Sequence, residues 1–287
     1  MLVHIKELFK NWKRGSFAYP AFNIQNLETT LAVVQAAEEL NVPIIMSVSE
    51  GTISYAGLET IFEMAATVAV RSKVPIALHM DHGKNMEQLE AGIELGFSSI
   101  MIDHSHLPME DNIRDTHAMA QLAHAEGAWV QGEIGRIRGN EDWISVEDSQ
   151  ALLTTPEEAK QFYEATNIDT FAGSFGTVHG AIKMTGKAKP HVDIQRIADI
   201  AAVVPVPLVL HGASGVPDSI VAETIKAGIG IVNIDTELRV AFAKGLRASI
   251  EEQAEEIDPR KLMKPVITSV KEAARLALVR CKTQNVI

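Results

Sequence analysis

Three histidines in this sequence each follow an apolar run that is typical of a β-strand. They are His82 in IALHMDHG, His179 in TFAGSFGTVHG and His211 in VPLVLHGASG. A single imidazole at the end of a strand is usually a hydrogen-bonded structural residue, whereas three imidazoles at the ends of three strands can converge on one ion. Three histidines with a further position left for substrate are the open coordination of catalytic zinc. The pattern therefore predicts a metal site formed by His82, His179 and His211.

Carboxylates stand beside these histidines and at the ends of other apolar runs. Asp81 directly precedes His82 and can act as a general acid or base while the histidine binds metal; the alternative is an aspartate that caps the next helix. Asp103 in MIDHSHLP and Glu133 in VQGEIG each follow an apolar run. They can accept hydrogen bonds from ligating histidines or bind a second cation, or they can pair with an inward-facing lysine or arginine.

Two turns built from small and polar residues follow the last two apolar runs, in HGASG and IVNIDTE. Backbone N–H groups that are not covered by large side chains can approach an anion closely at the mouth of a helix. Residues of the same types also populate ordinary turns for conformational reasons. The candidate anion-binding residues are Gly212, Ala213, Ser214, Asn233, Asp235 and Thr236.

Short apolar runs alternate with longer amphipathic stretches, which favours successive βα units and a parallel sheet. About eight such runs are present, the number that closes a barrel whose active site lies at the C-terminal ends of the strands. The expected fold class is α/β, a TIM (β/α)8 barrel with extra C-terminal helices; an open doubly wound sheet is the competing fold. The tail from Glu237 to Thr283 is expected to be helical, with interruptions at DPRK and at Pro265. The expected strands are Phe17–Phe22, Pro43–Val48, Pro75–His79, Ser99–Ile102, Trp129–Glu133, Asp169–Gly173, Pro207–His211 and Gly230–Ile234.

Composition sets limits on the class of protein. The 287 residues suit one barrel, so a single domain over 1–287 is expected. Hydrophobic residues make up 46% and charged residues 22%, and the formal charge of −11 argues against a nucleic-acid or membrane-surface partner. The single cysteine, Cys281, excludes an intramolecular disulfide and a multi-cysteine zinc site. No apolar run reaches membrane-spanning length and the first residues do not have the pattern of a signal peptide, so a cytoplasmic protein is expected.

The motifs LHMDHG, MIDHSHLP, GEIGRIRGNED, FGTVHGAIK, LVLHGASGVP and VNIDTELRVAFA occur in this order, with DPRK after them. As a set they resemble the class II, zinc-dependent ketose-bisphosphate aldolases of the fructose- and tagatose-bisphosphate type. The resemblance extends from PAFNIQN to the region after Asp258. It implies a TIM barrel, a homodimer or homotetramer, a Zn²⁺ cofactor with a monovalent cation as a further ion, and a sugar phosphate substrate. The implied reaction is the reversible cleavage of a ketose 1,6-bisphosphate to dihydroxyacetone phosphate and an aldehyde.

The resemblance also assigns roles to individual residues. It places the zinc ligands at His82, His179 and His211 and the catalytic aspartate at Asp81, which handles the proton of the C4 hydroxyl. Glu141, in the RGNED loop, exchanges the proton at C3. An arginine of the C-terminal tail, Arg275 or Arg280, is expected to reach a distal anion. The substrate-binding positions implied by the family are Asn26, Ser49, Gly180, Gly212, Ala213, Ser214, Asn233, Asp235 and Thr236.

Several residues depart from the usual family pattern and bear on the substrate. His104 stands where relatives carry a small residue, Arg138 where they carry a second glycine, and Ile182 where a tyrosine is common; Asp235 fits the fructose type. A ketose 1-phosphate with another anionic tail, such as 6-deoxy-6-sulfofructose 1-phosphate, is therefore an alternative substrate. Arg138 either contributes to recognition of that tail or is a solvated loop residue. His104 and His106 are second-rank metal candidates, because side chains of alternating direction cannot both face one site.

Two other classes of function stay open at this point. Barrel proteins can serve as noncatalytic partner subunits, because a fold does not fix a function. A different metal-dependent lyase or epimerase acting on a sugar phosphate is the nearer alternative, and it would release no triose phosphate from a ketose bisphosphate. The retained carboxylates and histidines favour an enzyme.

Overall fold

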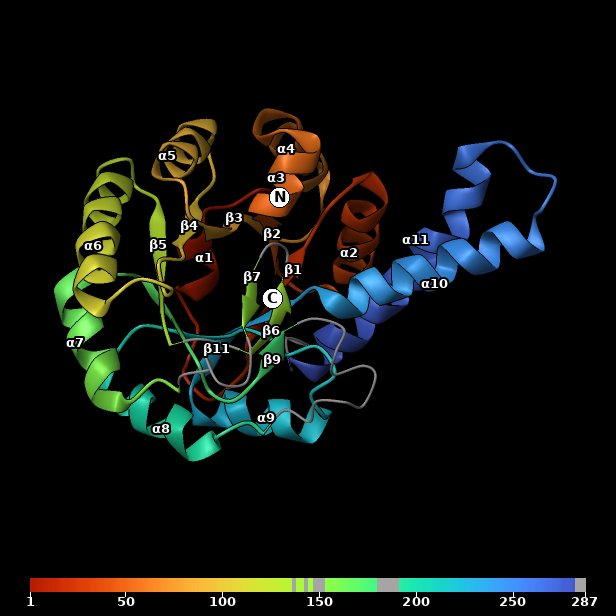
Figure 1. Cartoon of the computed structure of the whole chain (residues 1–287). Helices are drawn as coiled ribbons and strands as arrows, with labels where there is room; N and C mark the ends of the chain where they lie inside the picture. The colour runs from red at the N-terminus through yellow and green to blue at the C-terminus, as the bar shows by residue number, and fades with distance from the viewer. Residues whose placement is uncertain (136–137, 142–143, 147–152, 180–190, 282–287) are drawn as a thin grey trace.

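Eight parallel strands close a barrel in the computed structural model, which describes residues 1–135, 138–141, 144–146, 153–179 and 191–281 (Figure 1). The spatial order is β1-β11-β10-β8-β5-β4-β3-β2. All eight predicted strands are present and the sheet is closed, so the TIM barrel is confirmed against the open doubly wound sheet. The barrel strands are β1 (Tyr19–Asn23), β2 (Ile44–Ser49), β3 (Ile76–Gly83), β4 (Ser99–Ile102), β5 (Trp129–Ile134), β8 (Thr170–Gly173), β10 (Leu208–Leu210) and β11 (Ile229–Ile234).

Helices surround the barrel and begin at residues that suit helix N-termini. The side chains of Asn26, Asn85, Thr155 and Asp193 each accept a backbone N–H of the first turn, which satisfies a donor that the helix itself leaves unpaired. The helices are α1 (Ile5–Phe9), α2 (Leu27–Leu40), α3 (Glu50–Ala56), α4 (Leu58–Arg71), α5 (Met86–Leu95), α6 (Met109–Ala125), α7 (Pro156–Thr166), α8 (Ile194–Val203), α9 (Asp218–Ala227), α10 (Thr236–Glu252) and α11 (Pro259–Arg280).

The interior of the barrel changes from apolar to polar along the strands. Alternate residues of a strand face the same side, and the inward residues near the N-terminal strand ends form an apolar cluster with Ile5 and Leu8 of α1. Further along the same strands, the inward positions carry polar residues such as Ser47, His79 and Asp81, all of them buried. The fold therefore places buried polar side chains at the C-terminal end of the barrel, where active sites of this fold lie.

A second, small sheet lies outside the barrel order, with strands β7 (Ile144–Val146), β6 (Arg138–Glu141) and β9 (Val178–His179). β6 pairs with β7 antiparallel and with β9 parallel, and Gly139 is opposite His179. The expectation that His179 directly follows a barrel strand was wrong, because β8 ends at Gly173. Gly176 then turns the chain at φ 89°, where an added Cβ would lie 2.1 Å from the carbonyl oxygen of His191.

The last two helices, α10 and α11, run side by side and extend away from the barrel (Figure 1). The tail was predicted correctly as helical, but the interruption expected at DPRK lies just before it: α10 ends at Glu252, and Asp258 caps α11, which begins at Pro259. Pro265 was expected to interrupt the second helix, but α11 continues through it. Packing of α11 along both α10 and α2 offsets the one backbone hydrogen bond that proline removes.

In the described part of the chain, no single helix is both long and apolar enough to cross a membrane. The α3 and α4 helices, bent by 100° relative to each other, pass that test only as a pair.

Candidate active site

Asp81 lies on β3 with its side chain buried in the barrel, and its residue is 1% exposed. Its Oδ2 accepts a hydrogen bond from the side-chain amide of Asn23 at 2.8 Å, and its Oδ1 accepts one from the amide of Asn233 at 3.2 Å. These donors come from β1 and β11, two neighbouring strands that are not paired with β3. Two neutral donors from other strands fix the carboxylate without neutralising it, so Asp81 does not cap a helix and is available for proton transfer.

His82 sits at an irregularity of β3, where the register with β4 shifts between Met80 and Gly83. Its φ of 51° is in the left-handed region, which non-glycine residues seldom adopt and which is often found at functional sites. The sequence pattern predicted that Asp81 and His82 follow the third strand. This was wrong, because β3 continues to Gly83 and both residues belong to it. The local turn of the backbone lets two consecutive residues both present their side chains to the site.

Asp103 determines which nitrogen of His82 carries the hydrogen. Its Oδ2 is 2.9 Å from Nδ1 of His82, and its Oδ1 accepts from the Ser105 hydroxyl at 2.7 Å. Burial alone would raise the pKa of Asp103, but the hydrogen bonds from His82 and Ser105 outweigh burial and hold that pKa below its ordinary value. An ionised Asp103 accepts the Nδ1–H of His82. The Nε2 atom of His82 then presents its lone pair.

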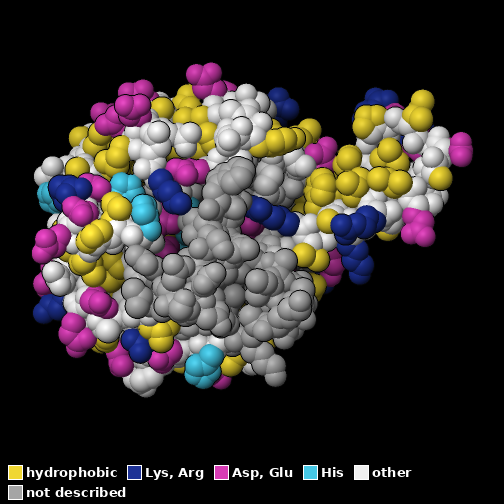
Figure 2. All heavy atoms as spheres, in the orientation of Figure 1, with side chains coloured by type: hydrophobic (Ala, Val, Ile, Leu, Met, Phe, Trp, Pro, Cys, Tyr) yellow, Lys and Arg dark blue, Asp and Glu magenta, His cyan; other side chains and the backbone are white. Residues whose placement is uncertain are grey.

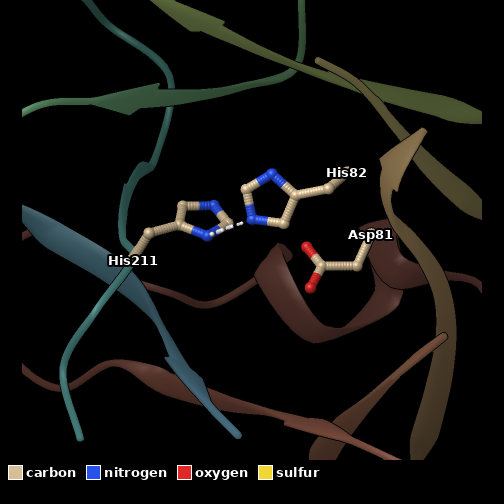
Figure 3. Close-up of side chains that lie close together, drawn as sticks. All are labelled: Asp81, His82 and His211. Atoms are coloured by element: carbon tan, nitrogen blue, oxygen red, sulfur yellow. Dashed lines mark hydrogen bonds between the residues drawn. The ribbon is translucent and has the colours of Figure 1, made fainter. Parts of the chain in front are cut away.

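That Nε2 atom faces His211, which directly follows β10 (Figure 3). The distance from Nε2 of His82 to Nδ1 of His211 is 3.1 Å, and the two rings meet edge to face. The amide nitrogen of Asn233 is 3.3 Å from the same Nδ1, which suits a bare nitrogen there. The Nε2 of His211 lies 3.0 Å from the side-chain amide of Gln131. The oxygen and nitrogen of the Gln131 amide can be exchanged by rotating the amide by 180°. In that orientation the Gln131 oxygen accepts the Nε2–H of His211.

This arrangement fits a zinc ion. Zinc–nitrogen bonds of about 2.0–2.1 Å at a tetrahedral angle place two ligand nitrogens roughly 3.3 Å apart, close to the 3.1 Å between His82 and His211. One group of candidate ligand atoms, all within 4.8 Å of one another, comes from Asp81, His82 and His211, and a second comes from His82, Asp103 and Glu133. Both groups are buried. The second group brings together Asp103 and Glu133, the two carboxylates predicted to bind a second cation.

The candidate anion-binding loop lies next to these histidines. Gly212 and Gly215 have φ values of 66° and 76°, and the N–H of Val216 donates to the carbonyl of Ala213. Ala213 and Ser214 between them are buried. Positive φ values at both glycines form the tight turn that brings backbone close to a ligand without side-chain bulk.

A pocket of about 450 Å³ opens at the N-terminal ends of α2, α3 and α10. Asp235, the residue before α10, accepts hydrogen bonds from Gln25 at 3.0 Å and from Arg239 at 2.7 Å. The Arg239 side chain is 42% exposed, so its guanidinium also meets solvent in the pocket. The lining residues are Gln25, Asn26, Thr29, Gly51, Thr52, Tyr55, Arg239 and Phe242.

The family model described as fructose-bisphosphate aldolase class-II matches residues 3–286. This chain belongs to that family. A fructose-bisphosphate aldolase of Thermus caldophilus is 39% identical over 296 residues, which cover 96% of this chain and 96% of the relative. The chain is accordingly an aldolase, an aldehyde-lyase, as the sequence motifs predicted.

Solved structures agree with this family. The YdjI aldolase of Escherichia coli K12 superposes with a TM-score of 0.84 at 28% identity, covering 99% of both chains. The fructose-bisphosphate aldolase Fba of Campylobacter jejuni superposes with a TM-score of 0.80 at 23% identity, covering 94% of this chain and 91% of the other. The second likeness supports the barrel fold alone.

The remaining predicted aldolase residues are placed as follows. Asn26 caps α2 and lines the pocket, and Ser49 caps α3. Thr236 begins α10. Among the C-terminal arginines, Arg280 is held by Glu237 and Asp218, and Arg275 by Glu272. The side chains of His179, Glu141 and Arg138, and all of Gly180 and Ile182, lie outside the described residues.

His104 does not turn toward the metal candidates. Its Nδ1 is 2.9 Å from Asp115 on α6, and its Nε2 is 3.1 Å from the carbonyl oxygen of Lys84. It therefore ties the loop after β3 to α6. The ring of His106 stacks edge to face against that of His104, with centroids 5.8 Å apart.

Five residues of the aldolase site were not selected from the sequence: Asn23, Gln25, His79, Gln131 and Arg239. Arg239 follows Asp235 by four residues on a helix, a spacing that puts two side chains on one face and could have indicated the pair. His79 precedes Asp81 by two residues on a strand, and so shares its face. Asn23 and Gln131 belong to other strands, and only the closed barrel brings them to the site.

Proposed function

We propose that this aldolase is zinc-dependent and cleaves fructose 1,6-bisphosphate reversibly to dihydroxyacetone phosphate and an aldehyde phosphate. The observation that carries the proposal is the approach of Nε2 of His82 to Nδ1 of His211 at 3.1 Å, beside the carboxylate of Asp81 (Figure 3). Two neutral imidazole nitrogens directed at one point, with a carboxylate next to them, suit a metal-assisted reaction with one proton-transfer group.

His82 and His211 would hold the zinc, with His179 as the third ligand implied by the sequence motifs. Zinc bound there supplies a Lewis acid for the substrate's C2 carbonyl and C3 oxygen. The chain supports this with Asp103, whose carboxylate keeps His82 in the tautomer with a bare Nε2. A Schiff-base lysine is not needed for this chemistry.

Asp81 would take the proton of the C4 hydroxyl during cleavage and return it during synthesis. The side chain is buried, and its two oxygens accept hydrogen bonds from Asn23 and Asn233. Neutral amide donors favour the ionised carboxylate, which is the form that accepts a proton. The same contacts hold the carboxylate in one orientation, so no reorganisation is needed when the proton moves.

Glu141 would exchange the proton at C3. Its strand β6 pairs with β9, which carries His179, so the proposed base and the proposed third ligand belong to adjacent strands of the small sheet. This role rests on the RGNED motif.

Local donors must hold the phosphates, because the chain has a net charge of −11. We assign the phosphate of the dihydroxyacetone end to the turn from Gly212 to Ser214, to Asn233 and to the start of α10 at Thr236. The far phosphate would enter the 450 Å³ pocket, which is lined by Gln25 and by the partly exposed Arg239, both of which also donate to Asp235. We assign this role to Arg239 in place of Arg275 or Arg280, because Arg239 lines the pocket and the other two arginines do not.

A homo-oligomer in the cytoplasm, built from a single domain, completes the proposal. Hydrophobic side chains lie along the arm formed by α10 and α11 (Figure 2). Within this arm Ile250 is 53% exposed and Ile257 is 91% exposed. Apolar residues projecting from an arm are typical of a surface that packs against another subunit.

The test is a coupled assay for dihydroxyacetone phosphate with fructose 1,6-bisphosphate, tagatose 1,6-bisphosphate and 6-deoxy-6-sulfofructose 1-phosphate in parallel. We expect release from fructose 1,6-bisphosphate at the highest kcat/KM, loss of that activity on chelation, and recovery on addition of zinc. Preference for another substrate would overturn the substrate assignment. Release from none of them by zinc-loaded protein would overturn the proposed reaction.

A further inference from the structure

A row of polar side chains crosses the barrel interior directly below Asp81. Asn23 is in register with Ser47, Ser47 with His79, and His79 with Ser99, on the consecutive strands β1 to β4. All four residues are buried. Beneath Asn23, Ser47 and His79, the preceding inward positions of their strands are apolar: Ala21, Ile45 and Ala77. The interior of a TIM barrel is usually filled by branched apolar residues, so this polar layer calls for an explanation.

Two members of the row face Asp81: Asn23, which donates a hydrogen bond to it, and His79. His79 and Asp81 are separated by one position on β3 and share its inner face. The Nε2 of His79 is 3.9 Å from Oδ1 of Asp81, and its Nδ1 is 2.9 Å from the hydroxyl oxygen of Ser99. Within the described residues, this Nε2 has no hydrogen-bond partner. A buried polar atom left in this state costs stability, which packing alone does not explain.

The ring of His79 is neutral. Burial is the largest cause that lowers the pKa of His79, to about 3. A neutral imidazole has one N–H group, and the Ser99 hydroxyl can donate to Nδ1. The hydrogen then lies on Nε2 and points toward the carboxylate of Asp81. The other tautomer would direct a lone pair at that carboxylate, and the low dielectric of the interior makes this arrangement unfavourable.

We propose that His79 is a positioning residue, whose Nε2–H group orients the Asp81 carboxylate for proton transfer at the C4 hydroxyl. This inference rests on the proposed function of Asp81. At 3.9 Å the contact acts on Asp81 through the electrostatic attraction between an N–H dipole and a carboxylate. It complements the direct hydrogen bonds from Asn23 and Asn233.

Two substitutions separate this role from a packing role. In His79→Asn, the amide occupies the place of Nδ1, keeps a partner for Ser99 and stops short of Asp81. In His79→Gln, the longer amide reaches the place of Nε2 and restores a donor toward Asp81. His124→Asn is the matched control, since His124 also contacts an aspartate, Asp169, at 2.8 Å, but on α6 outside the site.

Each protein is measured in two reactions and for zinc content. The first reaction is cleavage of fructose 1,6-bisphosphate, giving kcat and KM. The second is hydrogen exchange of dihydroxyacetone phosphate with D₂O, followed by NMR. Exchange needs the metal site and the base at C3, but no proton transfer at the C4 hydroxyl. A role confined to Asp81 therefore affects only cleavage.

For His79→Asn we expect about tenfold lower kcat for cleavage, with KM, zinc content and the exchange rate of the parent. His79→Gln should recover most of the lost kcat, and His124→Asn should match the parent throughout. Equal loss of cleavage and exchange in His79→Asn, unchanged kcat, or no recovery in His79→Gln would overturn the positioning role. A parent enzyme that exchanges dihydroxyacetone phosphate but cleaves no ketose bisphosphate would overturn the proposed function, and this inference with it.

Discussion

Removal of the Asp103 carboxylate should weaken zinc binding without removing a zinc ligand. Asp103 accepts the Nδ1–H of His82 at 2.9 Å, and both side chains are buried. A hydrogen bond to a charged partner in such a place contributes about 1.5–3 kcal/mol, and each 1.4 kcal/mol changes an affinity about tenfold. In Asp103→Ala the tautomer with a bare Nε2 is no longer favoured. We therefore expect roughly 10- to 100-fold weaker zinc binding in this variant.

The assay is a competition between the apoprotein and a chromophoric zinc chelator. Asp103→Asn keeps an acceptor oxygen but loses its charge, so its zinc affinity should fall between those of the parent and of Asp103→Ala. Asp169→Asn is the matched control, because Asp169 makes a similar contact to His124 at 2.8 Å away from the site. Asp103→Ala protein that is folded and binds zinc as tightly as the parent would refute the reasoning.

Three further predictions follow from other parts of the structure. Asp193→Ala removes the α8 cap and should lower the free energy of unfolding, measured by denaturation curves, by about 1 kcal/mol at pH 7. Because the hydrogen bond from the Arg196 backbone N–H lowers the pKa of Asp193, this difference from the parent should shrink as the pH falls below 3.8. A difference that does not depend on pH would contradict the prediction. Arg239→Ala should raise KM for fructose 1,6-bisphosphate about tenfold with little change in kcat. Arg275→Ala is the control, because Arg275 does not line the pocket, and it should leave KM unchanged. Equal KM values for the two variants would contradict the assignment of Arg239 to the far phosphate. Ile257→Asp should reduce the mass found by light scattering to that of a smaller assembly, and an unchanged mass would exclude Ile257 from the interface.

The eight barrel strands could be predicted because each is a short, apolar, nearly fully buried run. Such runs stand out between amphipathic helices, and the order of elements then indicates a barrel. The predicted third strand stopped at His79, but β3 continues to Gly83. The reason is that the inward positions of this strand become polar where the site begins, so the apolar pattern ends before the strand does.

The metal candidates could be predicted in part, because their residue types and their places after apolar runs are visible in the sequence. The contacts that prepare them could not. The hydrogen bond of Asp103 to His82 and the position of Gln131 next to His211 depend on strand register and barrel closure. Register and closure depend on residues far apart in the sequence, so the hydrophobic periodicity of a single segment does not predict them.

The small sheet was not expected either. Its strands span two to four residues, too few for an alternating pattern to be recognised. Pairing between β6 and β9 joins residues about forty positions apart. The prediction that Pro265 interrupts the last helix was wrong for a related reason. The stability of α11 comes from packing against α10 and α2 more than from the helix propensity of its residues.

The central claim is that His82 and His211 hold one zinc ion beside Asp81. Anomalous diffraction from crystals of the zinc-loaded protein, recorded above and below the zinc absorption edge, tests it most directly. The account predicts a single strong anomalous peak within bonding distance of Nε2 of His82 and Nδ1 of His211. A peak between Asp103 and Glu133 with none at the two histidines would contradict it. The absence of any peak in crystals of protein whose aldolase activity depends on zinc would contradict it as well.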